Sequence, residues 1–112
     1  MLSRELVAAS SKPLVLSILA RGENYGYAIM QEVKALSAEK IEWTEGMLYP
    51  VLHRLERDGL ISSRWGTADN GRERKFYNLT DKGRAGLRKE RYEWLVVHQT
   101  LQRLWKTAPA SI

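Results

Sequence analysis

The segment TEGMLYPVLHRLERDGLI, residues 44–61, carries side chains that suit contact with nucleic acid. Its apolar residues recur at helical spacing, and at about 100° per residue the glycine and the proline fall on the opposite side, beside the cations. Arginine can donate paired hydrogen bonds to guanine, and tyrosine, histidine and arginine can all donate to phosphate oxygens. Gly46 lets a phosphate or a base edge approach the backbone, and Pro50 removes one backbone hydrogen bond and favours a kink. The residues of this helix that we expect to contact DNA are Thr44, Gly46, Tyr49, Pro50, His53, Arg54 and Arg57. The alternative is a solvated helix face on which the glycine and the proline have no role.

A second group of cations lies in the hairpin that follows, with expected strands at 60–66 and 74–79 and the turn signal Asn70-Gly71 between them. So many cations on one small hairpin indicate a wing that binds the sugar-phosphate backbone with salt-sensitive affinity. The cations are Arg64, Arg72, Arg74 and Lys75. The alternative is an edge strand that charge protects from aggregation. We expect the aromatic residues of the hairpin to pack it against the helices; they are Trp65, Phe76 and Tyr77.

Caps and helix breakers indicate the elements that must position these groups. Thr44 and Thr80 are expected helix caps, Gly59 is a stop signal, and the residues before Pro13 should form a separate short helix or a kinked extension. We expect helices at 13–22, at 24–37 with Asn24 as cap, at 44–58 and at 80–106, with the hairpin before the last one. This order predicts a mostly α fold with a small β-hairpin, which is a winged helix-turn-helix plus a long C-terminal dimerisation helix. The expected divisions are a winged domain at 1–80, the dimerisation helix at 81–106 and a frayed tail at 107–112.

Composition narrows the class of partner. The chain has 112 residues, and 18 Lys and Arg against 13 Asp and Glu give a formal net charge of +5 at pH 7. This surplus favours an acidic partner, such as nucleic acid or an anionic membrane surface. The chain has no cysteine, so it has neither disulfides nor thiolate metal sites. It has no signal-peptide pattern and no apolar run near the roughly 18 residues of a membrane span, so we expect a cytoplasmic protein.

Enzymatic chemistry finds little support in the sequence. The two histidines, His53 and His98, fall on different expected elements and have no companion residues at metal-ligand spacing. Ser10 and Ser11 lack the setting of an activated nucleophile. We therefore expect no enzyme activity, no cofactor and no metal.

The last expected helix carries an apolar stripe with heptad-like spacing. A helix of about 25 residues would extend about 38 Å, which is longer than a small winged domain needs, so we expect a homodimer through this helix. The predicted interface residues are Leu87, Trp94, Leu101, Leu104 and Trp105. The alternative is that the stripe covers the first helix of the same chain, and both arrangements can hold in part.

Three segments together resemble the PadR family of bacterial transcriptional regulators: NYGYAIMQEV, EGMLYPVLHRLERDGLIS and RERKFYNLTDKG. The match covers nearly the whole chain, and the short C-terminal part resembles the compact subgroup that includes multidrug-sensing repressors. The resemblance implies a dimeric winged-helix repressor of the bacterial cytoplasm that binds palindromic double-stranded DNA. It assigns Tyr49 and Pro50 to the recognition helix, and Arg72, Arg74 and Lys75 to the wing.

The resemblance also implies a ligand site, because Trp94 aligns with the tryptophan that lines the drug-binding cavity of the multidrug-sensing members. By the same alignment the cavity residues would be Leu6, Pro13, Ser17, Trp94, Val97 and His98. His98 stands where an acidic residue would hold cationic drugs, so the cavity suits planar phenolic or anionic aromatics better, and such an effector would release the DNA. The alternative is that Trp94 and His98 only build the interface. For the whole chain, the alternative function is a winged-helix module that binds an acidic protein.

Overall fold

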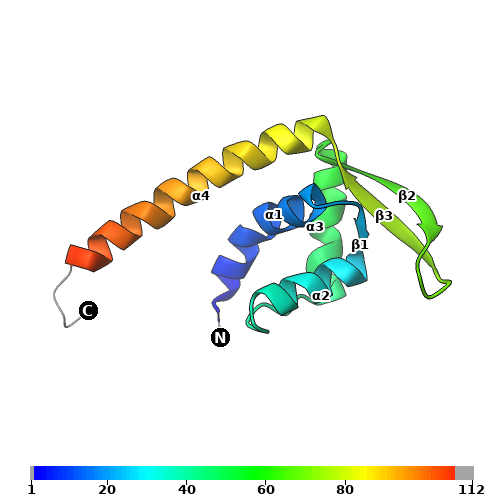
Figure 1. Ribbon diagram of the computed structural model, residues 1–112, viewed down its shortest axis with the longest axis horizontal. Helices are drawn as coiled ribbons and strands as arrows, with labels where there is room; N and C mark the ends of the chain where they lie inside the picture. The colour runs from blue at the N-terminus through cyan, green and yellow to red at the C-terminus, as the bar shows by residue number, and fades with distance from the viewer. Residues whose placement is uncertain (1, 108–112) are drawn as a thin grey trace.

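The computed structural model describes residues 2–107, which form three short helices, a small sheet and one long helix (Figure 1). The elements in chain order are α1 (Arg4–Ala20), β1 (Asn24–Tyr25), α2 (Gly26–Leu36), α3 (Glu45–Arg57), β2 (Ile61–Thr67), β3 (Glu73–Leu79) and α4 (Asp81–Thr107). Helix α4 passes over α1 and continues beyond it, so the molecule measures 55 × 28 × 21 Å. The mostly α winged-helix architecture with a long last helix confirms the predicted fold class. The predicted tail falls on residues 108–112 outside the described residues, apart from Thr107, which ends α4.

The predicted ends of α3 and α4 are confirmed. The Thr44 hydroxyl accepts a hydrogen bond from the Met47 amide at 3.3 Å, and the Thr80 hydroxyl accepts one from the Gly83 amide at 3.0 Å. After α3 the chain turns at Gly59, whose φ of 77° lies in the left-handed region that favours glycine. A side-chain cap at Thr44 and the left-handed backbone of Gly59 therefore mark the two ends of the helix that was expected to contact DNA.

Helix α1 is continuous through Pro13, so the residues before the proline extend this helix, which was one of the two predicted alternatives, and do not form a separate short helix. The hydroxyl of Ser3 caps the helix by accepting from the Leu6 amide at 3.1 Å. Beyond the proline, Leu16 and Leu19 are buried in the core. Burial of such leucines, at roughly 1.5–3 kcal/mol each, offsets the local cost of a proline.

The sheet has a strand that the sequence pattern did not reveal. Asn24 was expected to cap a helix, but β1 pairs with β3 through Asn24↔Tyr77 and Tyr25↔Phe76, and the sheet order is β1-β3-β2. The Asn24 amide oxygen accepts from the Tyr25 amide and its nitrogen donates to Glu32, so the side chain is occupied elsewhere. A two-residue strand is too short to show a period-2 pattern.

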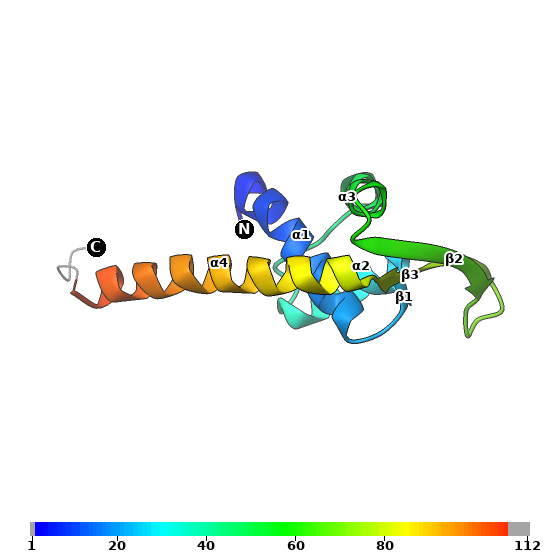
Figure 2. The same ribbon diagram turned by 90° about the horizontal axis from the view of Figure 1, so that it is seen from above.

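The wing, residues 61–79, comprises β2, its turn and β3, and extends past the helices (Figure 2). Tyr77 is 2% exposed and belongs to the core, and Phe76 packs on Tyr25, as expected of residues that anchor the hairpin. Trp65 is different, because it is 69% exposed and the expected packing against the helices is wrong. Its register partner is Lys75, whereas the residues buried between sheet and helices are Ile61 and Tyr77, nearer the base of the hairpin.

Helix α4 is covered by its own chain only at its start. Leu87 is 9% exposed and packs in the core, so its assignment to a dimer interface is wrong. Glu90 pairs with Lys12 of α1 at 3.4 Å, and Trp94 is half-buried. Farther along, Leu104 and Trp105 are 59% and 61% exposed, and Leu101 is 37% exposed. The apolar stripe therefore changes from core to open surface within one helix. No helix in residues 2–107 has the length and apolar character needed to cross a membrane.

Candidate nucleic-acid interface

Helix α3 presents one polar face to solvent and one apolar face to the core. Its core stripe consists of Leu48, Val51, Leu52 and Leu55, all buried. The exposed face carries the predicted set, which is Thr44, Gly46, Pro50, His53, Arg54 and Arg57. A side chain added at Gly46 would meet only the Thr44 hydroxyl, at 3.8 Å, so the backbone there is open to a large ligand. The neighbours Arg57 and Asp58 form an exposed ion pair at 3.6 Å, which contributes little because water screens it.

Tyr49 lies at the margin of this face. Its ring is half-buried against α2, and a Cβ atom placed on Gly26 would come within 2.6 Å of the Tyr49 hydroxyl oxygen. Gly26 thus leaves the space that the ring occupies, and Tyr49 joins α3 to the start of α2. Contact of Tyr49 with DNA stays a prediction.

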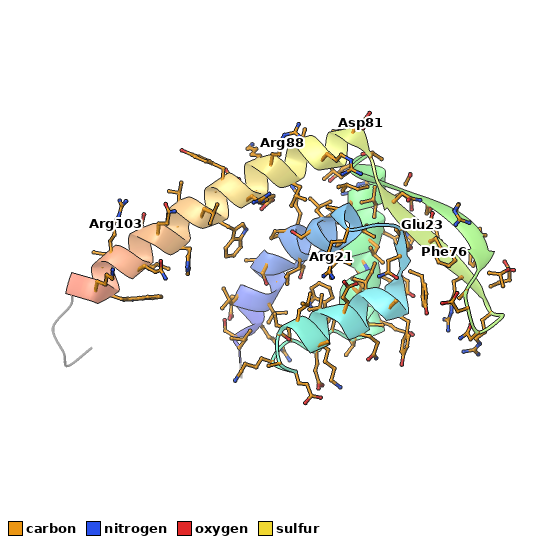
Figure 3. All side chains as sticks on the ribbon, viewed as in Figure 1. Arg21, Glu23, Phe76, Asp81, Arg88 and Arg103 are labelled. Carbon is orange, nitrogen blue, oxygen red and sulfur yellow. The ribbon has the colours of Figure 1, made fainter. Side chains whose placement is uncertain are left out.

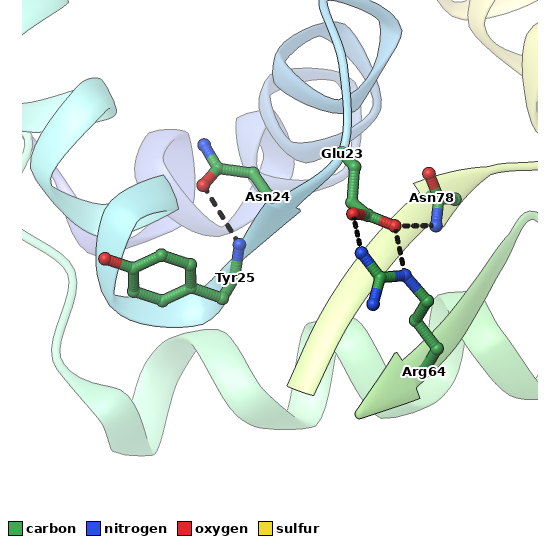
Figure 4. Close-up of polar contacts among 5 residues, drawn as sticks. All are labelled: Glu23, Asn24, Tyr25, Arg64 and Asn78. Atoms are coloured by element: carbon green, nitrogen blue, oxygen red, sulfur yellow. Dashed lines mark hydrogen bonds and ion pairs between the residues drawn. The ribbon is translucent and has the colours of Figure 1, made fainter. Parts of the chain in front are cut away.

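Arg64 of the wing is held by the chain itself (Figure 4). Its Nε donates to Glu23 Oε2 at 2.8 Å, and its terminal nitrogen donates to Oε1 of the same carboxylate. Asn78 donates to Glu23 Oε2 at 2.6 Å. The hydrogen bonds from Arg64 and then from Asn78 hold the pKa of Glu23 below its usual value, while the carboxylate raises the pKa of Arg64. Arg64 is therefore not the unengaged phosphate ligand that its type suggested.

An alternating stack of cations and rings covers the same face of the sheet. The Arg64 guanidinium lies 5.1 Å from the Phe76 ring centroid, and that of Arg74 lies 5.4 Å from the Tyr25 centroid. The Tyr25 and Phe76 rings meet edge to face with centroids 5.4 Å apart. Cation–π contacts of this kind stabilise by ~0.5–1 kcal/mol at exposed sites. Arg74 Nε is buried and has no hydrogen-bond partner within residues 2–107.

On the opposite face, Lys75 ties the wing to α3. Its Nζ lies 3.6 Å from Glu56 Oε1 and 5.7 Å from the Tyr77 ring centroid, and Ser63 donates to the other Glu56 oxygen. Burial, and next the charge of Glu56, raise the pKa of Tyr77 above its usual 10.0. The Glu56 carboxylate thus joins α3 to both strands of the hairpin.

Arg72 lies at the tip of the wing and is fully available. Asn70 Oδ1 accepts from the Arg72 amide at 3.0 Å, and Gly71 has a φ of 81°, so the predicted turn residues shape the tip. The Arg72 side chain is exposed and, within residues 2–107, has no intramolecular partner. Of the four predicted wing cations, Arg72 alone thus has a side chain without an ion pair, a hydrogen bond or a ring contact within residues 2–107.

The net charge is distributed unevenly along the chain, which the whole-chain value concealed. Residues 1–80 carry 11 Lys and Arg against 10 Asp and Glu, whereas residues 81–107 carry 7 against 3. On α4, Arg88 points away from α1 (Figure 3). Residues 1–80, which include α3 and the wing, have almost no net positive charge. Any attraction of a polyanion to α3 and the wing must therefore come from the local positions of their cations.

Comparison with known proteins identifies the chain. The model of the transcriptional regulator PadR-like family matches residues 15–89. The chain belongs to the PadR-like family of transcriptional regulators. The transcriptional regulator Rv3488 of Mycobacterium tuberculosis is 40% identical over 88 residues, which are 79% of this chain and 78% of that protein.

A second related sequence and a solved structure are also similar to this PadR-like chain. The negative transcriptional regulator PadR of Bacillus subtilis is 31% identical over 90 residues, which are 80% of this chain but 47% of that protein. The crystal structure of a PadR-like transcriptional regulator from Bacillus cereus superposes with a TM-score of 0.82 at 26% identity, over 93% of this chain and 99% of that one. The expectation of a regulator and not an enzyme is confirmed by this family membership.

The predicted effector residues of this PadR-like chain are only partly brought together. Helices α1 and α4 lie side by side, but Leu6, Ser17, Val97 and His98 are exposed, and Pro13 is half-buried. Ser17 borders a different space, an apolar cavity of about 320 Å³ between α1 and α2. The cavity is lined by Leu14, Ser17, Ile18, Arg21, Val33, Leu36, Ser37 and Ile41. Within residues 2–107 no cluster of His, Asp and Glu suits a metal ion.

Proposed function

We propose that this PadR-like regulator is a homodimeric repressor of the bacterial cytoplasm that binds a palindromic operator in double-stranded DNA. The observation that carries the proposal is the exposed polar face of α3, open at Gly46 and opposite a fully buried stripe, with the wing beside it (Figure 2). An α-helix of this kind fits the major groove, where side chains can read base edges. Repression is supported by the name of the Bacillus subtilis relative, a negative transcriptional regulator.

In this proposal His53 and Arg54 reach base edges from α3, and Arg72 at the wing tip binds phosphate. Lys75 and Arg74 hold the wing in place and add positive potential beside the backbone. Residues 1–80 form the DNA-binding domain. The bonds from Glu56 to the wing support this role, because base and phosphate contacts must keep a fixed distance from each other.

The dimer would form through the open part of α4, residues 94–105. An exposed stripe of leucine and tryptophan is unusual on a monomer. Leu101, Leu104 and Trp105 are exposed, and the half-buried Trp94 lies between them and the covered Leu87 along the helix. Two-fold symmetry would then present two copies of α3 to half-sites about one helical turn apart. A planar aromatic effector between the two Trp94 rings would release the operator if it bound the two spacings with different affinity.

The test is selection of bound duplexes from a random pool, followed by fluorescence anisotropy with the selected sequence. Arg54→Ala should cost about 1–3 kcal/mol and relax specificity at one base position. Arg88→Ala on the outer side of α4 is the matched control, since it removes the same charge far from α3. Failure to enrich any palindrome, with binding to acidic proteins instead, would refute the proposal in favour of a protein-interaction module.

A further inference from the structure

The wing cation Arg64 is already bound to a carboxylate of its own chain, that of Glu23. Arg64 lies on β2, the edge strand of the sheet, while Glu23 directly precedes β1 at the opposite edge. The guanidinium therefore reaches across β3, where Asn78 donates to the same carboxylate (Figure 4). Its direction is away from the free edge of β2.

Glu23 accepts hydrogen bonds from the same Arg64 nitrogens that would donate to a phosphate. A carboxylate and a phosphate both accept two parallel hydrogen bonds from arginine, and here Nε and a terminal nitrogen are both given to Glu23. Asn78 adds a third bond to the carboxylate. Glutamate is ionised at neutral pH in any case, so Glu23 offers Arg64 a charged acceptor. Any phosphate near β2 must compete with this acceptor.

The pair is nevertheless accessible to such competition. The Arg64 and Glu23 side chains are 56% and 29% exposed, and exposed ion pairs are weak because water and salt screen them. The Arg72 side chain, by contrast, has no acceptor among the residues that the structure describes. The wing thus has one cation whose side chain is open to a phosphate, Arg72, and two that are paired with carboxylates, Arg64 with Glu23 and Lys75 with Glu56.

We propose that Glu23 acts as an internal competitor for Arg64, withholding it from DNA phosphates, and so limits binding to non-operator DNA. This inference rests on the proposed DNA-binding function. Non-specific binding depends almost entirely on the number of phosphates neutralised. Withholding one cation therefore lowers non-operator affinity, while base contacts from α3 keep the operator affinity high. Glu23 is in this sense a specificity-determining residue, although it contacts neither base nor phosphate.

The test measures fluorescence anisotropy of the full chain with a non-operator duplex and with the selected operator, over a range of NaCl concentrations. Glu23→Gln should tighten non-operator binding by up to about eightfold at 0.1 M salt and steepen the salt slope by about 0.9, the contribution of one phosphate. Operator affinity should change less, so the specificity ratio should fall. Arg64→Gln alone leaves Glu23 unpaired and should weaken non-operator binding slightly, but it should leave the salt slope unchanged, because wild-type Arg64 neutralises no phosphate.

Two controls separate this from other roles of Glu23. The double variant Glu23→Gln with Arg64→Gln should return to the wild-type slope. Glu73→Gln removes a carboxylate of the wing that accepts from Thr67 and holds no arginine, so it measures general repulsion of DNA. Glu23→Ala repeats the charge removal if the glutamine variant folds poorly.

The results decide between three readings. A gain that needs Arg64 supports the proposal. If the gain persists in the Arg64→Gln background, or if Glu73→Gln reproduces it, the proposal is overturned and Glu23 simply repels DNA. If Glu23→Gln weakens binding to both duplexes, the proposal is also overturned, and the pair serves only to hold the wing in its structure. A wild-type chain that binds no DNA with a salt-dependent affinity would instead refute the proposed function, and this inference with it.

Discussion

Gly83, near the start of α4, offers a sharp test of how the long helix is attached. A Cβ atom at this position would lie 2.0 Å from the Leu60 carbonyl oxygen and 2.7 Å from a Leu79 methyl carbon. The same carbonyl accepts a hydrogen bond from the Thr80 amide at 3.1 Å, so it cannot turn away freely. We expect Gly83→Ala to force the helix away from the connection between α3 and β2.

The magnitude follows from three opposing terms. Alanine gains about 1 kcal/mol over glycine in a helix interior. Overpacking costs about 1–3 kcal/mol, and loss of the Thr80 bond costs about 1 kcal/mol. The net expectation for Gly83→Ala is a loss of about 1–3 kcal/mol of unfolding free energy, or about 4–8 °C in Tm for each kcal/mol in a chain of this size.

Gly86, one turn later, is the matched control. A Cβ atom there would lie 3.5 Å from a Leu60 methyl carbon, an ordinary contact, so Gly86→Ala should stabilise by up to about 1 kcal/mol. The assay is urea unfolding followed by circular dichroism at one protein concentration. If Gly83→Ala is as stable as the wild type, or if both variants shift in the same direction, the close contact described for Gly83 is not what holds α4.

Four further outcomes follow from the structure. Replacing Leu101 and Trp105 by glutamate should give monomers in sedimentation and abolish operator binding, and a wild type that is monomeric at micromolar concentration would contradict the proposed dimer. Arg72→Ala should weaken binding to all duplexes alike and flatten the salt slope by about 0.9, so an unchanged slope would exclude Arg72 as a phosphate ligand. The lowered pKa of Glu23 means that its stabilising contribution is complete above about pH 4.3 and is lost as the pH falls through the folded-state value; Glu23→Gln should therefore lose less stability than the wild type between about pH 5 and pH 3, and equal losses in urea titrations would argue against the pair. Planar aromatics should quench tryptophan fluorescence in the wild type more than in Trp94→Ala, and equal quenching would leave Trp94 a packing residue only.

Caps and helix breakers in the sequence predicted where the helices end. Features that depend on contacts between distant residues could not be predicted from them. Thr44, Gly59 and Thr80 mark helix ends by chemistry that acts within a few residues, so their positions were predictable. The burial of Leu87 against the exposure of Leu101 was not, because both occupy the same stripe and only the extent of α1 separates them.

The candidate site also combines features that local sequence predicts with features that depend on distant residues. The open face of α3 followed from helical period alone. Arg64 looked like a wing cation from its neighbours in sequence, but its partner Glu23 is 41 residues away and has no local signal. The continuity of α1 through Pro13 likewise depends on core packing that no window around the proline contains.

The attachment of α4 has a mechanical consequence. A helix of 27 residues is about 40 Å long, so a tilt of ~5° at its base displaces its far end by about 3.5 Å. In the other direction, a displacement of several ångströms at the far end turns the base by only a few degrees. Three contacts stiffen this fulcrum: Gly83 on the Leu60 carbonyl, the Thr80 hydroxyl donating to Gly59 O at 2.7 Å, and Lys82 Nζ donating to Asp58 O at 2.7 Å. The carbonyls of Leu60, Gly59 and Asp58 lie in the few residues that join α3 to the wing, so a rotation of α4 at its base would act where α3 and the hairpin meet.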